Sequence, residues 1–178
     1  GEIFLEGTNI SGWTPDRICH RGITRTFQLN VGFDTLSVRE NVLIASYYGL
    51  KNRTLPGLRF DRASQRRADE ALEVVGMTDQ REAIVKDLPV FYRKLLMVAG
   101  VLATEPKLLL MDEPVGGLNQ QEMYKVMGLV DRVRERGVTT IIIEHVMRFL
   151  IQVSDRALIM HHGEKIYEGS TDGLCRDK

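Results

Sequence analysis

Apolar and polar positions follow one another along this chain in runs that predict a mixed α/β fold. The clearest run, residues 108–111, leads directly into two acids, Asp112 and Glu113, and then into Pro114. A short apolar run of this kind fits a strand that is buried on both faces of a parallel sheet. Because a carboxylate is costly to bury, we expect both acids at the carboxyl edge of the sheet, where open α/β sheets bind ligands.

The segments that follow this strand continue the alternation of elements. Residues 120–136 have apolar positions at helical spacing, residues 138–143 form a β-branched run that we expect to be buried, and residues 146–153 predict a short helix. Residues 156–161 and 165–169 predict an antiparallel pair of strands. Strand, helix, strand and helix in alternation indicate a parallel sheet.

The upstream half of the chain predicts two strands and several helices. Residues 2–7 and 23–28 have the pattern of strands, whereas residues 62–75 and 95–103 have the apolar spacing of helices. Ser37, with a glutamate three residues later, has the arrangement of a capping box at a further helix start.

One glycine pair resembles a phosphate-binding loop in its spacing only. Gly7 and Gly12 are five residues apart, but Trp13 stands where the lysine of such a loop should be. A turn between a strand and the short helix that begins at Pro15 is the favoured interpretation. No other G-x-x-x-x-G-K-[ST] pattern occurs in the 178 residues.

Composition narrows the class of protein. Lys plus Arg and Asp plus Glu are equal at 24 each, so charge gives no argument for a nucleic-acid partner. Cys19 and Cys175 are far apart and are interpreted as reduced thiols of a cytosolic protein. No apolar stretch reaches the roughly 18 residues of a membrane span, and no signal peptide is evident. The chain opens at Gly1 inside an expected strand, which suggests a fragment of a longer protein.

Polar side chains follow three of the predicted strands. Gln28, the Asp112–Glu113 pair and His145 all stand at strand ends, and the ends of parallel strands share one edge of a sheet. This set resembles the ATP-binding subunit of ABC transporters. In that resemblance, residues 111–114 correspond to the Walker B segment with its following glutamate, and residues 117–119, ending in Asn119, to the D-loop. His145 corresponds to the switch histidine and Gln28 to the Q-loop glutamine.

Further motifs are similar to the branched-chain amino-acid uptake type of this family. They are Arg25-Thr26-Phe27-Gln28, Leu88-Pro89, Ile143-Glu144-His145 and Tyr167-Glu168-Gly169-Ser170. Lipopolysaccharide-export and urea-uptake ATPases are close relatives that stay open as alternatives. The resemblance covers residues 1–178 and implies a P-loop NTPase-like parallel sheet core that is truncated at the N-terminus. It also implies a helical subdomain over about residues 37–104.

The resemblance also implies a mechanism, ATP hydrolysis with Mg²⁺. Asp112 would hold the metal, Glu113 would act as the general base on the attacking water, and His145 would contact the γ-phosphate. Gln28 would reach the metal or the water, and Asn119 would face the second subunit of a homo- or heterodimer. The implied partners are transmembrane permease subunits and not nucleic acid. The implied location is cytoplasmic, on the inner face of the plasma membrane.

Each of these residues also has a simpler interpretation. Asp-Glu-Pro also serves to end a strand and begin a loop, and a histidine at a strand end is commonly a surface residue. Gly-Gly-Leu-Asn, which includes Asn119, is ordinary turn chemistry.

Two departures from the family pattern shape the expected activity. The glycine-rich loop with its lysine is expected to precede the stretch where this chain begins, so the fragment alone is expected to be inactive. In the signature segment, Phe91 stands where the family has glycine and Tyr92 where it has Gln or Glu. We expect the Phe91 side chain to block the approach of the helix to ATP on the opposite subunit. A non-catalytic ABC-fold partner or regulatory subunit is therefore the alternative function.

Overall fold

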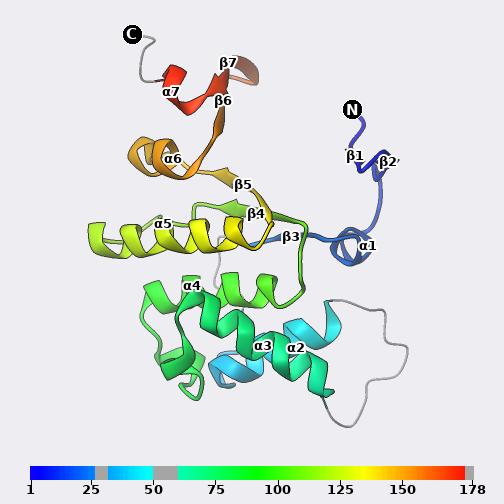
Figure 1. Cartoon of the computed structure of the whole chain (residues 1–178), viewed down its shortest axis with the longest axis vertical. Coiled ribbons are helices and arrows are strands. Elements are labelled where there is room, and N and C mark those ends of the chain that lie inside the picture. The colour runs from blue at the N-terminus through cyan, green and yellow to red at the C-terminus, as the bar shows by residue number, and fades with distance from the viewer. Residues whose placement is uncertain (27–31, 50–59, 175–178) are drawn as a thin grey trace.

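The computed structural model describes residues 1–26, 32–49 and 60–174 (Figure 1). Its elements follow in the order β1 (Phe4–Leu5), β2 (Thr8–Asn9), α1 (Pro15–His20), β3 (Ile23–Arg25), α2 (Val38–Tyr48), α3 (Arg62–Val75), η1 (Thr78–Gln80), η2 (Val85–Asp87), α4 (Val90–Leu102), β4 (Leu108–Asp112), α5 (Gln120–Glu135), β5 (Thr139–Ile143), α6 (Met147–Val153), β6 (Arg156–His161), β7 (Glu164–Ser170) and α7 (Thr171–Leu174).

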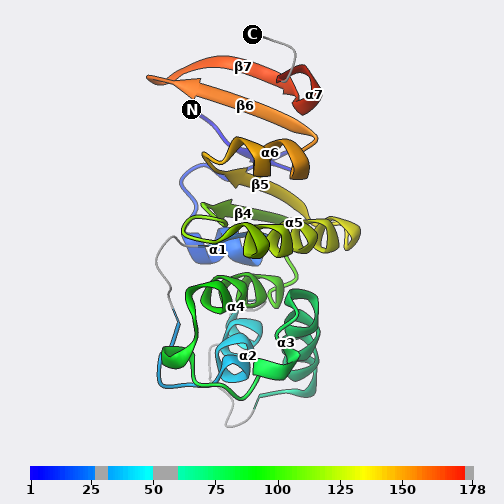
Figure 2. The ribbon, with the colours of Figure 1, turned by 90° about the vertical axis from the view of Figure 1, so that its left-hand side faces the viewer.

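The central feature of the fold is a parallel three-stranded sheet in the order β3-β4-β5. β4 lies in the middle, and its last residue, Asp112, pairs in register with Ile143 of β5. Helices connect the parallel strands, as the alternation after residue 108 predicts. β6 and β7 form the expected antiparallel hairpin at one end of the molecule (Figure 2).

The first strand of the chain is shorter than the sequence predicts. The segment expected as one strand over residues 2–7 contains only the two residues of β1, which turn back into β2 as a small hairpin. Glu6 and Gly7 both have positive φ angles, of 48° and 76°, and this turn ends the strand. Of the second expected strand, over residues 23–28, the structure shows β3, which ends at Arg25; residues 27 and 28 lie outside the described residues.

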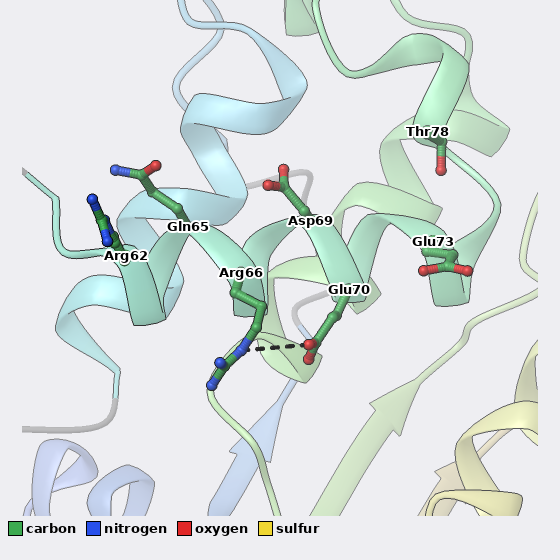
Figure 3. A pocket seen from close by; sticks show the side chains of 7 residues that line it. All are labelled: Arg62, Gln65, Arg66, Asp69, Glu70, Glu73 and Thr78. Carbon is green, nitrogen blue, oxygen red and sulfur yellow. Dashed lines mark ion pairs between the residues drawn. The ribbon is translucent and has the colours of Figure 1, made fainter.

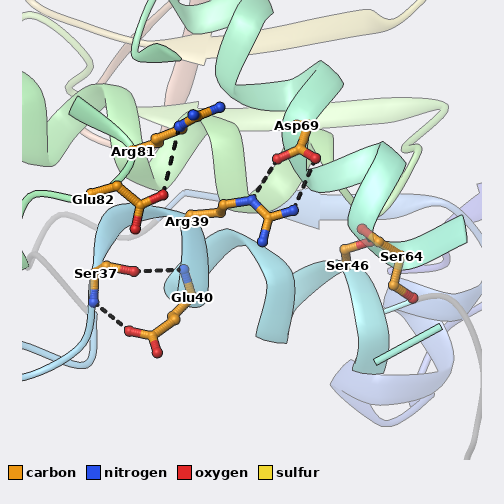
Figure 4. Close-up of polar contacts among 8 residues, drawn as sticks. All are labelled: Ser37, Arg39, Glu40, Ser46, Ser64, Asp69, Arg81 and Glu82. Atoms are coloured by element: carbon orange, nitrogen blue, oxygen red, sulfur yellow. Dashed lines mark hydrogen bonds and ion pairs between the residues drawn. The ribbon is translucent and has the colours of Figure 1, made fainter. Parts of the chain in front are cut away.

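Helices α2, α3 and α4 pack on one another in a layer at the end opposite the β6–β7 hairpin (Figure 2). The expected capping box begins α2, where the Ser37 hydroxyl accepts from the Glu40 N–H and the Glu40 carboxylate accepts from the Ser37 N–H (Figure 4). Between α2 and α3, Arg39 forms a bidentate pair with Asp69, at 2.7 and 3.0 Å. The helical subdomain over about residues 37–104 stays a proposal about domain boundaries.

Helix α4 begins five residues earlier than the sequence predicts. Its first residue is Val90 rather than Leu95, and Pro89 precedes it without any side-chain capping hydrogen bond. The expected helix over residues 62–75 has the predicted bounds, because the Asp61 carboxylate caps its start and Gly76 ends it with a φ of 74°. The signature segment therefore belongs to the first turn of α4.

The core joins the helical layer to the buried face of the sheet. Leu109 and Met111 of β4 are buried in it, as is Phe149 of α6. The sheet is less buried than expected, because β4 alternates between buried and half-buried positions. In β5, Ile141 and Ile143 are half or more exposed, so the prediction of a buried strand at 138–143 is wrong for that face. Their side chains point to the side opposite Ile142, which packs against the core.

None of the helices in the described ranges combines the length and the apolar content needed to cross a bilayer.

Candidate functional site

The candidate site begins where β4 ends. Asp112 is the last residue of the strand, and its side chain is about one-fifth exposed. Arg25 Nη2, at the end of β3, lies 2.7 Å from Asp112 Oδ2, so the carboxylate is paired with a guanidinium. The Asp112 N–H donates to the Thr26 hydroxyl at 3.3 Å. The carboxylate that the sequence singles out thus lies at the carboxyl edge of the sheet, as expected, but with a cation already beside it.

Glu113 follows immediately, and its main chain is held by three contacts. Its φ of 46° lies in the left-handed region, which is unusual for a residue other than glycine. Its N–H donates to the Ile143 carbonyl at 2.9 Å. Its carbonyl accepts from Lys94 Nζ of α4 at 2.8 Å and from the Gly116 N–H at 3.2 Å. Unusual backbone conformations persist only where the surroundings fix them, and they gather at functional sites.

His145 lies two residues beyond β5, at the same edge of the sheet as Asp112 and Glu113. Its side chain is 72% exposed, and Nδ1 lies 3.6 Å from Glu144 Oε2. Because β4 and β5 are adjacent and parallel, with Asp112 opposite Ile143, the two strand ends lie side by side (Figure 1). An exposed imidazole at this position is accessible to a ligand at the edge.

Glu144 is the residue of this edge to which the sequence assigns no role. Its side chain has no exposed surface, and Oε1 accepts from the Val115 N–H at 3.0 Å. Oε2 accepts from the N–H groups of His145 and Val146, at 2.9 and 3.2 Å. The available signal was its position, a carboxylate directly between a β-branched strand and the candidate histidine.

Of the other two candidate residues, the structure describes Asn119 alone. Gln28 lies outside the described residues. Asn119 is the N-cap of α5, where its side chain accepts from the Glu122 N–H at 3.0 Å and the Glu122 carboxylate accepts from the Asn119 N–H. Asn119 is exposed, but its oxygen is engaged in this capping box. Local helix capping accounts for asparagine at this position.

The signature segment differs from its expected arrangement. Phe91 is only 7% exposed and belongs to the hydrophobic core. Its ring meets that of Tyr92 edge-on, with 5.3 Å between centroids, and Lys125 Nζ lies 5.4 Å from the ring centre. The expectation that the Phe91 side chain projects from the helix and blocks a ligand is therefore wrong, because the first turn of α4 points this residue inward. Val90, 55% exposed, occupies the outward position instead.

Of two cavities in the described part of the chain, the one at the edge of the sheet is small and the larger one lies elsewhere. A small cavity of about 20 Å³ lies beside Asp112, lined also by Thr26 and Lys94. A wider, open depression of about 590 Å³ lies on α3 (Figure 3). Its lining side chains are charged or polar, and none comes from the loops after β4 and β5; they are Arg62, Gln65, Arg66, Asp69, Glu70, Glu73 and Thr78.

The donor groups at the edge fit a metal bound together with a ligand. Across the described ranges, no three or more His, Cys, Asp or Glu side chains gather as a metal cluster. Mg²⁺ nevertheless is commonly held by one or two carboxylates, waters and substrate phosphates, rather than by a cage of protein ligands. The single carboxylate of Asp112 fits that mode of binding.

The fold and this edge define a parallel α/β cassette in which acidic groups and a histidine follow adjacent strands. The family model described as ABC transporter matches residues 1–116, and the chain belongs to that family. The predicted family, the ABC-type ATPases, and the predicted P-loop NTPase-like fold are both confirmed.

Individual relatives agree with this assignment. The high-affinity branched-chain amino acid transport ATP-binding protein BraF of Pseudomonas aeruginosa is 30% identical to this chain, over 98% of the chain and 71% of BraF. LivG of Escherichia coli, with the same description, is 31% identical over the same shares. Among solved structures, MJ1267, an ATP-binding cassette of an ABC transporter, has a TM-score of 0.87 at 24% identity. That match covers 99% of this chain and 72% of MJ1267, and it shows the fold alone.

Proposed function

We propose that this protein is the ATP-binding and ATP-hydrolysing subunit of an ABC importer for branched-chain amino acids. The observation that carries the proposal is that Asp112, Glu113 and His145 all lie at one edge of the sheet. The descriptions of BraF and LivG support the substrate class. Importers of urea and exporters of lipopolysaccharide are the alternatives within the family.

Asp112 is proposed to hold Mg²⁺, directly or through water, with phosphate oxygens of ATP completing the coordination. The metal would neutralise charge on the phosphates during transfer to water. In this structure Arg25 Nη2 forms an ion pair with Asp112 Oδ2 at 2.7 Å, and the Arg25 side chain is about half exposed. Its long side chain has room to leave Asp112 when a cation of higher charge arrives.

Glu113 is proposed as the general base on the attacking water, since it directly follows the proposed metal ligand, Asp112, at the edge of the sheet. His145 is proposed to hydrogen-bond the γ-phosphate, a role that its 72% exposure allows. Gln28 is proposed to reach the metal or the water. For Asn119, a contact with a second ATPase subunit would use the part of its side chain that the cap leaves exposed.

The proposed partners follow from this class of protein. A second copy or a related ATPase subunit would complete a dimer, and transmembrane permease subunits would receive the energy of hydrolysis. The protein would then lie on the cytoplasmic side of the plasma membrane as a peripheral subunit.

The experiment compares the Glu113→Gln variant with the wild type in ATP binding and in phosphate release, each in a full-length protein that includes the glycine-rich loop. Glutamine keeps the size of the side chain but cannot accept a proton from water, so ATP binding should persist. Hydrolysis should fall about 100-fold or more, the usual contribution of general base catalysis. The exposed Glu135, on the last turn of α5, offers the matched control Glu135→Gln, which should hydrolyse ATP at the wild-type rate.

The outcomes separate the candidate functions. Hydrolysis at the wild-type rate by Glu113→Gln would refute the assignment of the base. A full-length wild type that neither binds nor hydrolyses ATP would favour the non-catalytic partner. Uptake of labelled leucine, but not of labelled urea, that depends on Glu113 would support the branched-chain substrate class, and the reverse would favour urea.

A further inference from the structure

The loops that follow β4 and β5 are joined by one buried carboxylate. Glu144 belongs to the loop after β5, yet its Oε1 accepts the N–H of Val115 in the loop after β4, at 3.0 Å. Its Oε2 accepts the N–H groups of His145 and Val146 in its own loop. A single side chain therefore ties the segment that carries Glu113 to the segment that carries His145.

The chemistry of this link requires both carboxylate oxygens. Burial of an unpaired carboxylate is costly, and here three main-chain donors compensate for the complete loss of exposed surface. Glutamine has the same shape but only one oxygen, and its NH₂ group cannot accept from an N–H. At this position, glutamine would leave at least one of the two loops without its acceptor.

A second contact holds the Glu113 main chain from the helical layer. Lys94 of α4 donates from Nζ to the Glu113 carbonyl at 2.8 Å. Burial lowers the pKa of Lys94, while the charges of Glu144 and Glu113 act in the opposite direction. The ammonium group thus lies within the electrostatic reach of both carboxylates, and the main chain of Glu113 is fixed in its left-handed conformation from α4 and from β5.

We propose that Glu144 and Lys94 are positioning residues for ATP hydrolysis. Glu144 holds the loop of Glu113 and the loop of His145 in one relative geometry. Lys94 fixes the main chain of Glu113 and thereby the orientation of its side chain. Neither residue touches ATP; each acts through Glu113 or His145. This inference rests on the proposed function, which gives Glu113 and His145 their roles.

The first test measures the link in the protein without nucleotide, by amide hydrogen exchange at single residues with NMR. In Glu144→Gln, exchange at Val115, or at His145 and Val146, should accelerate at least tenfold relative to the wild type. The control is again Glu135→Gln, for which exchange at these amides should not change. Unchanged exchange at all three amides in Glu144→Gln would overturn the assignment of Glu144.

The second test measures the consequence for catalysis in the full-length protein that includes the glycine-rich loop. A misplaced catalytic group lowers the rate of the chemical step without removing the contacts that bind substrate. Glu144→Gln should therefore lower kcat about tenfold or more and leave the Kd for ATP within about twofold. A loss of ATP binding in proportion to activity, or a loss of folded protein by circular dichroism, would overturn the positioning role in favour of a merely structural one.

Lys94 offers a conservative rescue. Lys94→Arg keeps a donor for the Glu113 carbonyl, whereas Lys94→Met keeps only the apolar stem. The methionine variant should lose kcat at unchanged Kd, and the arginine variant should recover most of it. Equal kcat values for both variants would show that the hydrogen bond to Glu113 does not matter.

The failure of this inference differs from the failure of the proposed function. If the wild type hydrolyses ATP and Glu144→Gln does so equally well, only the positioning role is wrong. If the full-length wild type does not hydrolyse ATP, the proposed function is wrong and the catalytic part of this inference falls with it. The exchange experiment still decides in that case whether Glu144 joins the two loops.

Discussion

Truncation of Phe91 to alanine gives the sharpest test of how α4 is built. The signature position in this chain carries a phenylalanine that is 7% exposed and belongs to the core. Loss of a buried phenylalanine ring typically costs about 3–5 kcal/mol, including the cavity that it leaves. The edge-on contact with Tyr92 is part of that cost. Alanine is a good helix former, so the helix itself loses nothing in propensity.

The expected result is therefore a decrease of about 3–5 kcal/mol in the free energy of unfolding. This is a large fraction of the roughly 5–15 kcal/mol that stabilises a typical domain. For a chain of this size it corresponds to a fall in Tm of roughly 6–20 °C. Urea unfolding followed by circular dichroism measures the difference directly, with the midpoint and slope compared between the variant and the wild type.

Val90, the preceding residue, is a matched control because it lies in the same turn but is 55% exposed. Val90→Ala should change the free energy of unfolding by no more than about 0.5 kcal/mol. A cost below about 1 kcal/mol for Phe91→Ala would mean that the ring is not in the core. The ring would then be available at the surface, and the steric argument about ligand approach would apply again.

Two further predictions concern polar contacts outside the sheet edge. Asn119→Ala should destabilise the protein by about 1 kcal/mol through loss of the α5 cap, whereas Asn119→Asp should keep the cap. Equal stability of both variants in thermal unfolding would contradict the capping role. A dimer defect in the aspartate variant alone would indicate an interface role. The hydrogen bond from Arg39 lowers the pKa of Asp69, so the stability that this pair contributes is present above about pH 4 and is lost as the pH falls through the lowered folded-state pKa. Because Asp69 is 49% exposed, the pair contributes at most about 1 kcal/mol to stability. Asp69→Asn should remove this contribution at pH 7 but should have no such effect at pH 2. An equal loss of stability at both pH values would exclude the ion pair as its source.

The sequence predicts those elements whose ends carry their own chemical signals. Helix α3 has its expected bounds because Asp61 and Gly76 supply a cap at each end. The start of α4 was missed because Pro89 offers no side-chain cap. The residues that follow, which are β-branched or aromatic, also have only modest helix propensity. Packing of Phe91 in the core, a tertiary effect, extends the helix to Val90.

The same distinction applies to the candidate site. The sequence places Asp112 and His145 at one edge of the sheet because the ends of apolar strands are visible in the hydrophobic pattern, and a parallel sheet brings adjacent strand ends together. The partner of Asp112 was not found, because Arg25 is separated from it by 87 positions and pairs with it only through the β3–β4 register. Gln28 stays a prediction, since it lies outside the described residues.

Glu144 shows why a residue of this kind escapes sequence reasoning. Its partners are three main-chain N–H groups, which every residue except proline carries, so no second side chain marks the contact. Its function as a link depends on the distance between two loops, and that distance is set by the pairing of β4 with β5. A sequence records only that an acid precedes the candidate histidine. The burial of that acid in the folded chain, with both oxygens occupied, turns an unassigned neighbour into a candidate determinant of the geometry between Glu113 and His145.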